Sequence, residues 1–361
     1  MLGGVASQLL RIVLAFSLRS LGLTVLEITV LSSTFMLARG LSAPYIGKLA
    51  DRGISRLLFM ALGFAGLGLD SFLYLIVPYP LMIGIRAMDG VFGAMAWTTM
   101  QAVVHLSSPR KMKGRIMSSY FMMGGLGGAV GYLMYNYFLG NIIYSVITVA
   151  TLSFLNIILL YPFRGVQTAK SEEKREENRG NVGVEIYSLN FLYGMFFSLG
   201  AEVLWFYLSE SMGLGKYTTT FYLSIFSLAA LFGTFLMGFI ADKKSYEFTL
   251  LLLGILALLS GVGLMVNSIL VVLISTFVFY ISGRSFLPIS RSFVASKSRT
   301  LGASLGYVNL SSNLGAVISP LIGGFVYDAL HSYSLFNLNL SAVSFAVLGL
   351  AIFGNTLLIK S

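Results

Sequence analysis

Six ionisable side chains lie within long apolar stretches of this sequence, where a charge is costly. At the centre of a membrane-spanning helix such a group costs roughly 2.5–3.5 kcal/mol on insertion scales, so those that are present are candidates for function. A buried acid can carry a proton, and a buried arginine can bind an anion or neutralise an acid. The candidates for a substrate or proton pathway are Arg39, Asp70, Arg86, Asp89, Glu202 and Arg284.

Four of these candidates have an equally simple structural alternative. Arg39 and Asp70 fall at similar depths on neighbouring antiparallel helices, so they could form a structural ion pair or act on substrate or proton. Arg86 and Asp89 are three residues apart and share one helical face. They could neutralise each other, or Arg86 could tune proton transfer at a nearby acid.

The remaining two candidates lie in the second half of the chain. Glu202 comes just before Trp205, Phe206 and Tyr207. In that apolar setting it could carry a proton, or it could reach the outer interface among the aromatic side chains. Arg284 lies midway along its helix, where it could bind an anionic group of a substrate or close an internal ion pair.

Composition indicates that these residues belong to a membrane protein. The chain is 57% hydrophobic and only 11% charged, whereas a soluble domain has about 25% charged residues. It has no Cys and two His, which excludes disulfides, cysteine nucleophiles and a His-based metal cluster. No phosphate-binding Gly-Lys-Ser/Thr loop occurs. We therefore expect no enzymatic activity, no cofactor and no metal.

Apolar stretches of the required length, about 20 residues, predict the membrane-spanning helices. We expect twelve, of which the first, 2–18, is short and carries Arg11 near its middle; it is bent, or the sequence starts late within it. The other spans are 25–49, 57–77, 81–106, 114–138, 141–162, 188–209, 217–241, 247–266, 269–292, 302–328 and 336–359.

The connections between these spans alternate in charge. Lys and Arg cluster in every second connection, whereas the opposite connections are nearly free of them, and the clusters do not resemble a nucleic-acid-binding patch. The positive-inside rule then places both termini in the cytoplasm of a cell inner or plasma membrane. The charged segment 164–187 reads as a cytoplasmic linker between two bundles of six helices, 1–163 and 188–361.

A six-residue phrase occurs twice and supports a duplication. Residues 47–52, Gly-Lys-Leu-Ala-Asp-Arg, return as Gly-Phe-Ile-Ala-Asp-Lys at 238–243, and both copies end a long apolar stretch. A second, weaker repeat relates residues 126–131 to residues 314–319. Membrane proteins built from two related halves are usually transporters.

These residues resemble the major facilitator superfamily of secondary transporters. The phrase Gly47-Lys-Leu-Ala-Asp51-Arg52-Gly53-Ile-Ser-Arg56 is similar to that family's signature between its second and third helices, and Arg86-x-x-x-Gly90 is similar to a fourth-helix pattern. The resemblance implies a gating motif made of Gly47, Asp51, Arg52, Arg56, Gly238 and Asp242, in which Asp51 acts as a latch between the halves. It also implies helix-packing positions that slide during transport, at Gly124, Gly127, Gly128, Gly131, Gly315 and Pro320.

The resemblance predicts an all-α permease that moves a small solute by alternating access. We expect a monomer in the lipid bilayer, coupled to protons, without nucleic-acid partners. The many aromatic side chains favour efflux of drug-like or amphipathic metabolites. The alternatives are uptake of a sugar or organic acid, or a non-transporting membrane sensor with the same fold. Tyr132 stands where Pro320 stands in the second half, which departs from the pattern of the family's antiporters.

Overall fold

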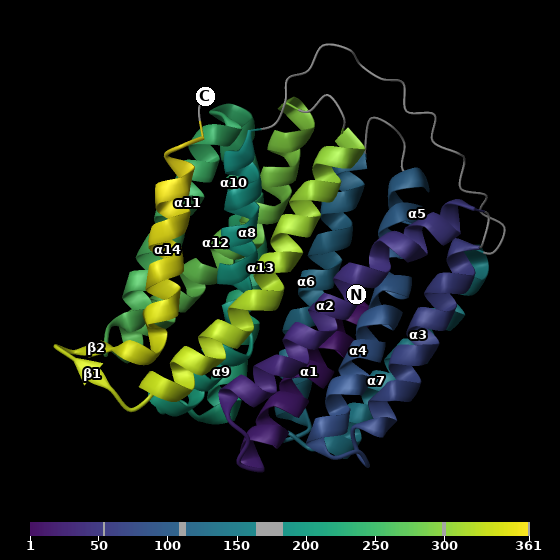
Figure 1. Ribbon diagram of the computed structural model, residues 1–361, viewed down its shortest axis with the longest axis horizontal. Helices are drawn as coiled ribbons and strands as arrows, with labels where there is room; N and C mark the ends of the chain where they lie inside the picture. Colours follow the sequence, from purple (N-terminus) through teal and green to yellow (C-terminus); the bar gives the residue numbers. More distant parts are fainter. Residues whose placement is uncertain (53–54, 108–112, 164–182, 298–300, 360–361) are drawn as a thin grey trace. The chain divides into compact units, whose positions relative to one another are not determined.

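The computed structural model describes residues 1–52, 55–107, 113–163, 183–297 and 301–359. The structure is almost entirely helical (Figure 1). The first half contains α1 (Leu2–Ser20), α2 (Val25–Asp51), α3 (Arg56–Leu73), α4 (Tyr79–Gly93), η1 (Ala94–Thr98), α5 (Thr99–Ser107), α6 (Lys113–Tyr137), α7 (Ile142–Leu160) and η3 (Tyr161–Phe163). The second half contains α8 (Val184–Leu199), α9 (Glu202–Phe206), η4 (Tyr207–Ser211), α10 (Gly215–Lys243), α11 (Tyr246–Met265), α12 (Ile269–Lys297), α13 (Leu301–Leu330), β1 (Ser334–Leu335), β2 (Leu338–Asn339), η5 (Leu340–Ala342) and α14 (Val343–Thr356).

The chain divides into two compact units that pack their helices in the same order. Unit 1 comprises residues 1–23 and 30–173, and unit 2 comprises residues 24–29 and 174–361. In unit 1, α1 packs on α6 and α7, and α3 packs on α4 and α7. In unit 2, α8 packs on α13 and α14, and α11 packs on α12 and α14. The contacts of one half are therefore repeated in the other, as a duplicated helical bundle requires.

Twelve helical segments account for the predicted spans, with α4, η1 and α5 forming one segment and α8, α9 and η4 another. Among the described residues, nine helices are long and apolar enough to cross a membrane. The first helix has 19 residues, close to the length a crossing needs. Most of the predicted linker falls outside the described residues, and α8 begins at Val184, inside the range assigned to that linker.

Three predicted spans are corrected by the structure. The span 81–106 contains a π-helical turn at η1, and the span 188–209 breaks at Gly200–Ala201, where Ala201 has non-helical φ −92° and ψ −119°. The span 336–359 begins too early, because residues 334–339 form a β-hairpin and α14 starts at Val343. Phe336 and Asn337 both have positive φ, 46° and 63°, which is the geometry of the tight hairpin turn that Asn favours.

The start of α2 is capped by both its own sequence and a distant acid. Thr24 Oγ1 accepts from the Glu27 N–H at 3.2 Å, and Glu27 Oε2 accepts from the Thr24 N–H at 2.8 Å, which together form a capping box. Within unit 2, the Asp328 carboxylate also accepts from the N–H groups of Val25 at 3.0 Å and Leu26 at 2.7 Å. These contacts satisfy donors that a helix leaves unpaired at its N-terminus.

Glycines allow the closest helix approaches in each unit. A Cβ on Gly127 would overlap the carbonyl oxygen of Met1 on the neighbouring chain segment, and a Cβ on Gly315 would overlap that of Phe191 on α8. A Cβ on Gly124 meets nothing within 4 Å, although the Gly124 carbonyl itself lies against Gly4. The two glycines that stand at equivalent positions of the repeat therefore serve the same packing role, on α1 and on α8.

Candidate functional site

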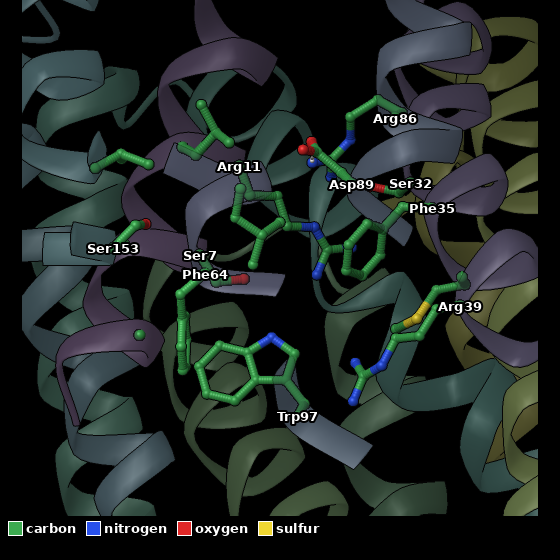
Figure 2. Close-up of a pocket in the computed structure, with 16 residues that line it drawn as sticks. Ser7, Arg11, Ser32, Phe35, Arg39, Phe64, Arg86, Asp89, Trp97 and Ser153 are labelled. Atoms are coloured by element: carbon green, nitrogen blue, oxygen red, sulfur yellow. Dashed lines mark hydrogen bonds and ion pairs between the residues drawn. The ribbon is translucent and has the colours of Figure 1, made fainter. Parts of the chain in front are cut away.

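A pocket of about 150 Å³ lies inside unit 1 (Figure 2). Its polar lining comes from α1, α2, α4 and α7, and its aromatic lining comes from α2, α3 and η1. The charged and aromatic residues around it are Arg11, Phe35, Arg39, Phe64, Arg86, Asp89 and Trp97, with Ser7, Ser32 and Ser153 among the neutral polar ones. Three of the six ionisable candidates, Arg39, Arg86 and Asp89, thus share one pocket.

The best-defined part of the pocket is a network around Asp89. Arg86 Nη1 donates to Asp89 Oδ2 at 3.1 Å, and the Tyr74 hydroxyl, at the end of α3, donates to the same oxygen at 2.6 Å. Asp89 is fully buried and Arg86 is 7% exposed. Asp89 Oδ1 and Arg86 Nε have no hydrogen-bond partner among the residues that the structure describes. The network therefore contains one buried acceptor and one buried donor that are not paired within it.

Local packing holds α4 in place for this network. The guanidinium of Arg86 lies over the ring of Phe35 on α2, 4.9 Å from the ring centroid. A side chain at Gly90 would overlap the Phe35 carbonyl oxygen. Because Gly90 has none, α4 approaches α2 closely enough for the stacking of Arg86 on Phe35.

The aromatic wall of the pocket includes a residue of the π-helical turn. Trp97 lies in η1, and its ring meets that of Phe64 edge to face with centroids 5.4 Å apart. A Cβ on Gly3 would overlap the Trp97 ring. The glycine on α1 therefore makes the space that the indole occupies.

A family model described as Major Facilitator Superfamily matches residues 1–298 and, in a second match, residues 186–358. The chain belongs to this superfamily. No curated protein sequence matches it.

Solved transporters share its fold. A bacterial homologue of the human lysosomal transporter Spinster, in an inward-facing and occupied conformation, superposes with a TM-score of 0.73 at 16% identity, over 99% of this chain and 91% of that chain. The nucleoside transporter NupG superposes with a TM-score of 0.70 at 12% identity, over 99% of this chain and 96% of that chain. The chain is thus a membrane protein of a secondary-transporter family.

Among the predicted pathway residues of this superfamily member, Arg39 and Asp70 do not pair with each other. Arg39 lines the pocket and has Tyr120 of α6 as its electrostatic neighbour. Asp70 is 5% exposed and lies near Asp89 instead. Similar depth along two helices therefore did not make them partners, because they face different neighbours.

The two candidates of the second half lie in unit 2. Glu202 is 2% exposed and begins α9, just after the break at Gly200–Ala201, so its side chain is buried within the protein, and both of its predicted roles stay predictions. Arg284 is half-buried on α12; it donates to the Ser227 hydroxyl of α10 and lies 5.7 Å from the centroid of the Tyr280 ring. Arg284 therefore links α12 to α10, and its role beyond that link stays a prediction.

The residues of the predicted gating motif lie at helix ends. Asp51 ends α2, Arg52 is exposed just after it, and Arg56 begins α3. Asp242 is exposed in the last turn of α10. A Cβ at either motif glycine, Gly47 or Gly238, would meet no atom of the described residues within 4 Å.

Sequence reasoning missed several residues of the pocket. Trp97, Phe64 and Tyr74 read as ordinary apolar lining of a membrane helix, and no pattern distinguishes them in the sequence. Arg11 carried a usable signal, because a charge in the middle of the first span is costly. Its side chain does line the pocket, from α1.

Proposed function

We propose that this chain is a proton-coupled secondary transporter that moves a small amphipathic organic solute by alternating access. The observation that carries the proposal is the composition of the unit 1 pocket. It places a buried carboxylate with its arginine next to an aromatic wall. An aromatic wall suits the apolar part of a solute, and buried ionisable groups suit its polar part.

Asp89 is our candidate for the proton carrier. When ionised it holds Arg86 at 3.1 Å. A proton on Asp89 would weaken that ion pair and free the Arg86 guanidinium for a bound solute. Loss of the proton would restore the ion pair between Arg86 and Asp89. Proton and solute binding would thus be linked through one arginine. Asp70, near Asp89, and Glu202, buried in unit 2, are the further candidates.

Export is the direction that the aromatic-rich sequence favours, but the pocket supports a second candidate. Three arginines and one carboxylate line it, which favours uptake of an organic acid. In that case the anion and the proton would bind together. We also propose that the protein acts as a monomer with both termini in the cytoplasm.

The test is solute-driven proton movement in proteoliposomes. The vesicles contain a pH-sensitive dye and receive members of a library of organic acids, sugars and aromatic drugs. We expect some solutes to move protons, and we expect Asp89→Asn to abolish this movement while solute exchange continues, because exchange needs no net proton transfer. Lys216→Gln, at an exposed position, is the control.

The outcomes also separate the candidate functions. Inward proton movement with the solute indicates uptake, and proton movement opposite to the solute indicates export. Solutes that bind without any flux would indicate the membrane sensor instead. Proton movement that Asp89→Asn leaves intact would refute the assignment of the proton carrier.

A further inference from the structure

The unit 1 pocket has an excess of positive charge. Arg11 of α1, Arg39 of α2 and Arg86 of α4 line it, and Asp89 is the one acid among its lining residues (Figure 2). Figure 2 shows the three arginines entering from different helices. Asp89 already accepts from Arg86 and from Tyr74. Even with Asp70 counted beside Asp89, the arginines outnumber the carboxylates around this space.

Arg86, which lines the pocket, carries a buried donor without an acceptor among the described residues. Arg86 is 7% exposed, and no described residue accepts a hydrogen bond from its Nε. A buried donor of a charged group that lacks an acceptor is destabilising, so a ligand that supplies an acceptor would be favoured. Guanidinium groups present their donors in a planar fork that matches a carboxylate or phosphate.

The rest of the pocket selects for a flat apolar body. The edge-to-face pair of Trp97 and Phe64 forms one wall, and Phe35 is held by its stacking with Arg86. The volume of about 150 Å³ is that of a cavity which accepts benzene. The volume of the pocket therefore admits a single aromatic ring.

We propose that this pocket binds a compact aromatic organic acid, with the carboxylate or phosphate on Arg39 and Arg86 and the ring against Trp97 and Phe64. The proposal rests on the transport function proposed above and names the chemical class of its substrate. Arg11 adds to the positive potential from α1, and the serines of the lining offer neutral hydrogen bonds.

The test compares ring compounds that differ only in charge. Benzoate, phenyl phosphate, benzamide and benzylammonium are titrated into the purified full-length protein, and ligand-observed NMR gives each dissociation constant. We expect the two anions to bind at least tenfold more tightly than the amide and the cation. The ratio between phenyl phosphate and benzoate tells which head group the site prefers.

Variants test whether the preference for anions depends on Arg39 in the pocket. Arg39→Gln should weaken benzoate by roughly tenfold to a hundredfold, the value of one hydrogen bond to a charged group, and leave benzamide within about twofold. Arg39→Lys keeps the charge but loses the planar fork of donors. Its dissociation constant for benzoate should lie between those of the unaltered protein and Arg39→Gln. Lys216→Gln removes an exposed charge outside the pocket and should leave all four compounds unchanged.

The inference and the proposed function can fail separately. Equal binding of benzamide and benzoate, no binding of any of the four compounds, or an unchanged benzoate constant in Arg39→Gln overturns the inference, even if the proteoliposomes show solute-driven flux. Conversely, anion binding that depends on Arg39 supports the inference even if no flux is found. If Arg39→Gln does not fold, the comparison among the four compounds on the unaltered protein and the Arg39→Lys variant still decides.

Discussion

Removing Arg86 should cost far more stability than removing the whole network to which it belongs. The Arg86→Met variant would leave the Asp89 carboxylate, which is fully buried, with the Tyr74 hydroxyl at 2.6 Å but without its counter-charge. Breaking one side of a buried ion pair costs about 3–5 kcal/mol. We expect Arg86→Met to lower the free energy of unfolding by an amount in this range.

The loss of unfolding free energy becomes smaller as Asp89 and then Tyr74 are also replaced. In Arg86→Met with Asp89→Leu no charge remains, and the residual cost is that of the buried Tyr74 hydroxyl without an acceptor, about 1–3 kcal/mol. Adding Tyr74→Phe removes that cost as well. Because well-packed apolar groups often replace a buried ion pair without loss, the triple variant should return close to the stability of the unaltered protein.

The assay is equilibrium unfolding of purified protein in mixed micelles of mild detergent and dodecyl sulfate, followed by the loss of helical signal. The free energy of unfolding should fall in Arg86→Met, recover partly in the double variant and recover further in the triple variant. Costs that simply add from one variant to the next would refute the reasoning, because they would mean that the three side chains do not interact. We expect all three variants to lose transport activity. A triple variant that is stable but inactive would show that the network is needed for function and not for stability.

Three further predictions follow from other positions. Gly127→Val should destabilise the protein by more than 1 kcal/mol, since its Cβ overlaps the Met1 carbonyl, whereas Gly124→Val, with open space, should shift the thermal unfolding midpoint little. Asp328→Ala should cost about 1 kcal/mol of unfolding free energy, because the N–H groups at the start of α2 lose their acceptor; an unchanged midpoint would contradict that role. Asp51→Asn, in the predicted gating motif, should slow solute flux in proteoliposomes without lowering solute affinity, and normal flux would remove the latch hypothesis.

The helices and their repeat could be predicted from the sequence because they rest on one-dimensional signals. Apolar length sets the number of crossings, and the repeated phrase placed the ends of α2 and α10 within two residues of their observed positions. The family was predictable from the same phrase. The hairpin before α14 was missed because Leu335, Leu338 and the aromatic residues near them look as apolar as a membrane helix. Only the backbone conformation at 336–337 tells the two apart.

The sequence carries a capping signal at the start of α2. Thr24-x-x-Glu27 before an apolar run is the pattern of a capping box, and the structure forms it. Asp328 shows the opposite case, because no local pattern connects it with Val25, about three hundred residues earlier. Its role follows only from the packing of the first turn of α2 within unit 2.

The pocket itself could be predicted only in part, for a geometric reason. Depth along a helix follows from counting residues, and it brought Arg39, Arg86 and Asp89 to attention. The direction of a side chain around the axis depends on regular winding at roughly 100° per residue. The π-helical turn at η1 (Ala94–Thr98) inserts one residue into that winding, so every later residue is displaced by about that angle from its expected face. Residues after this turn, on α5, therefore cannot be placed around the helix axis by counting from Arg86 and Asp89 on α4.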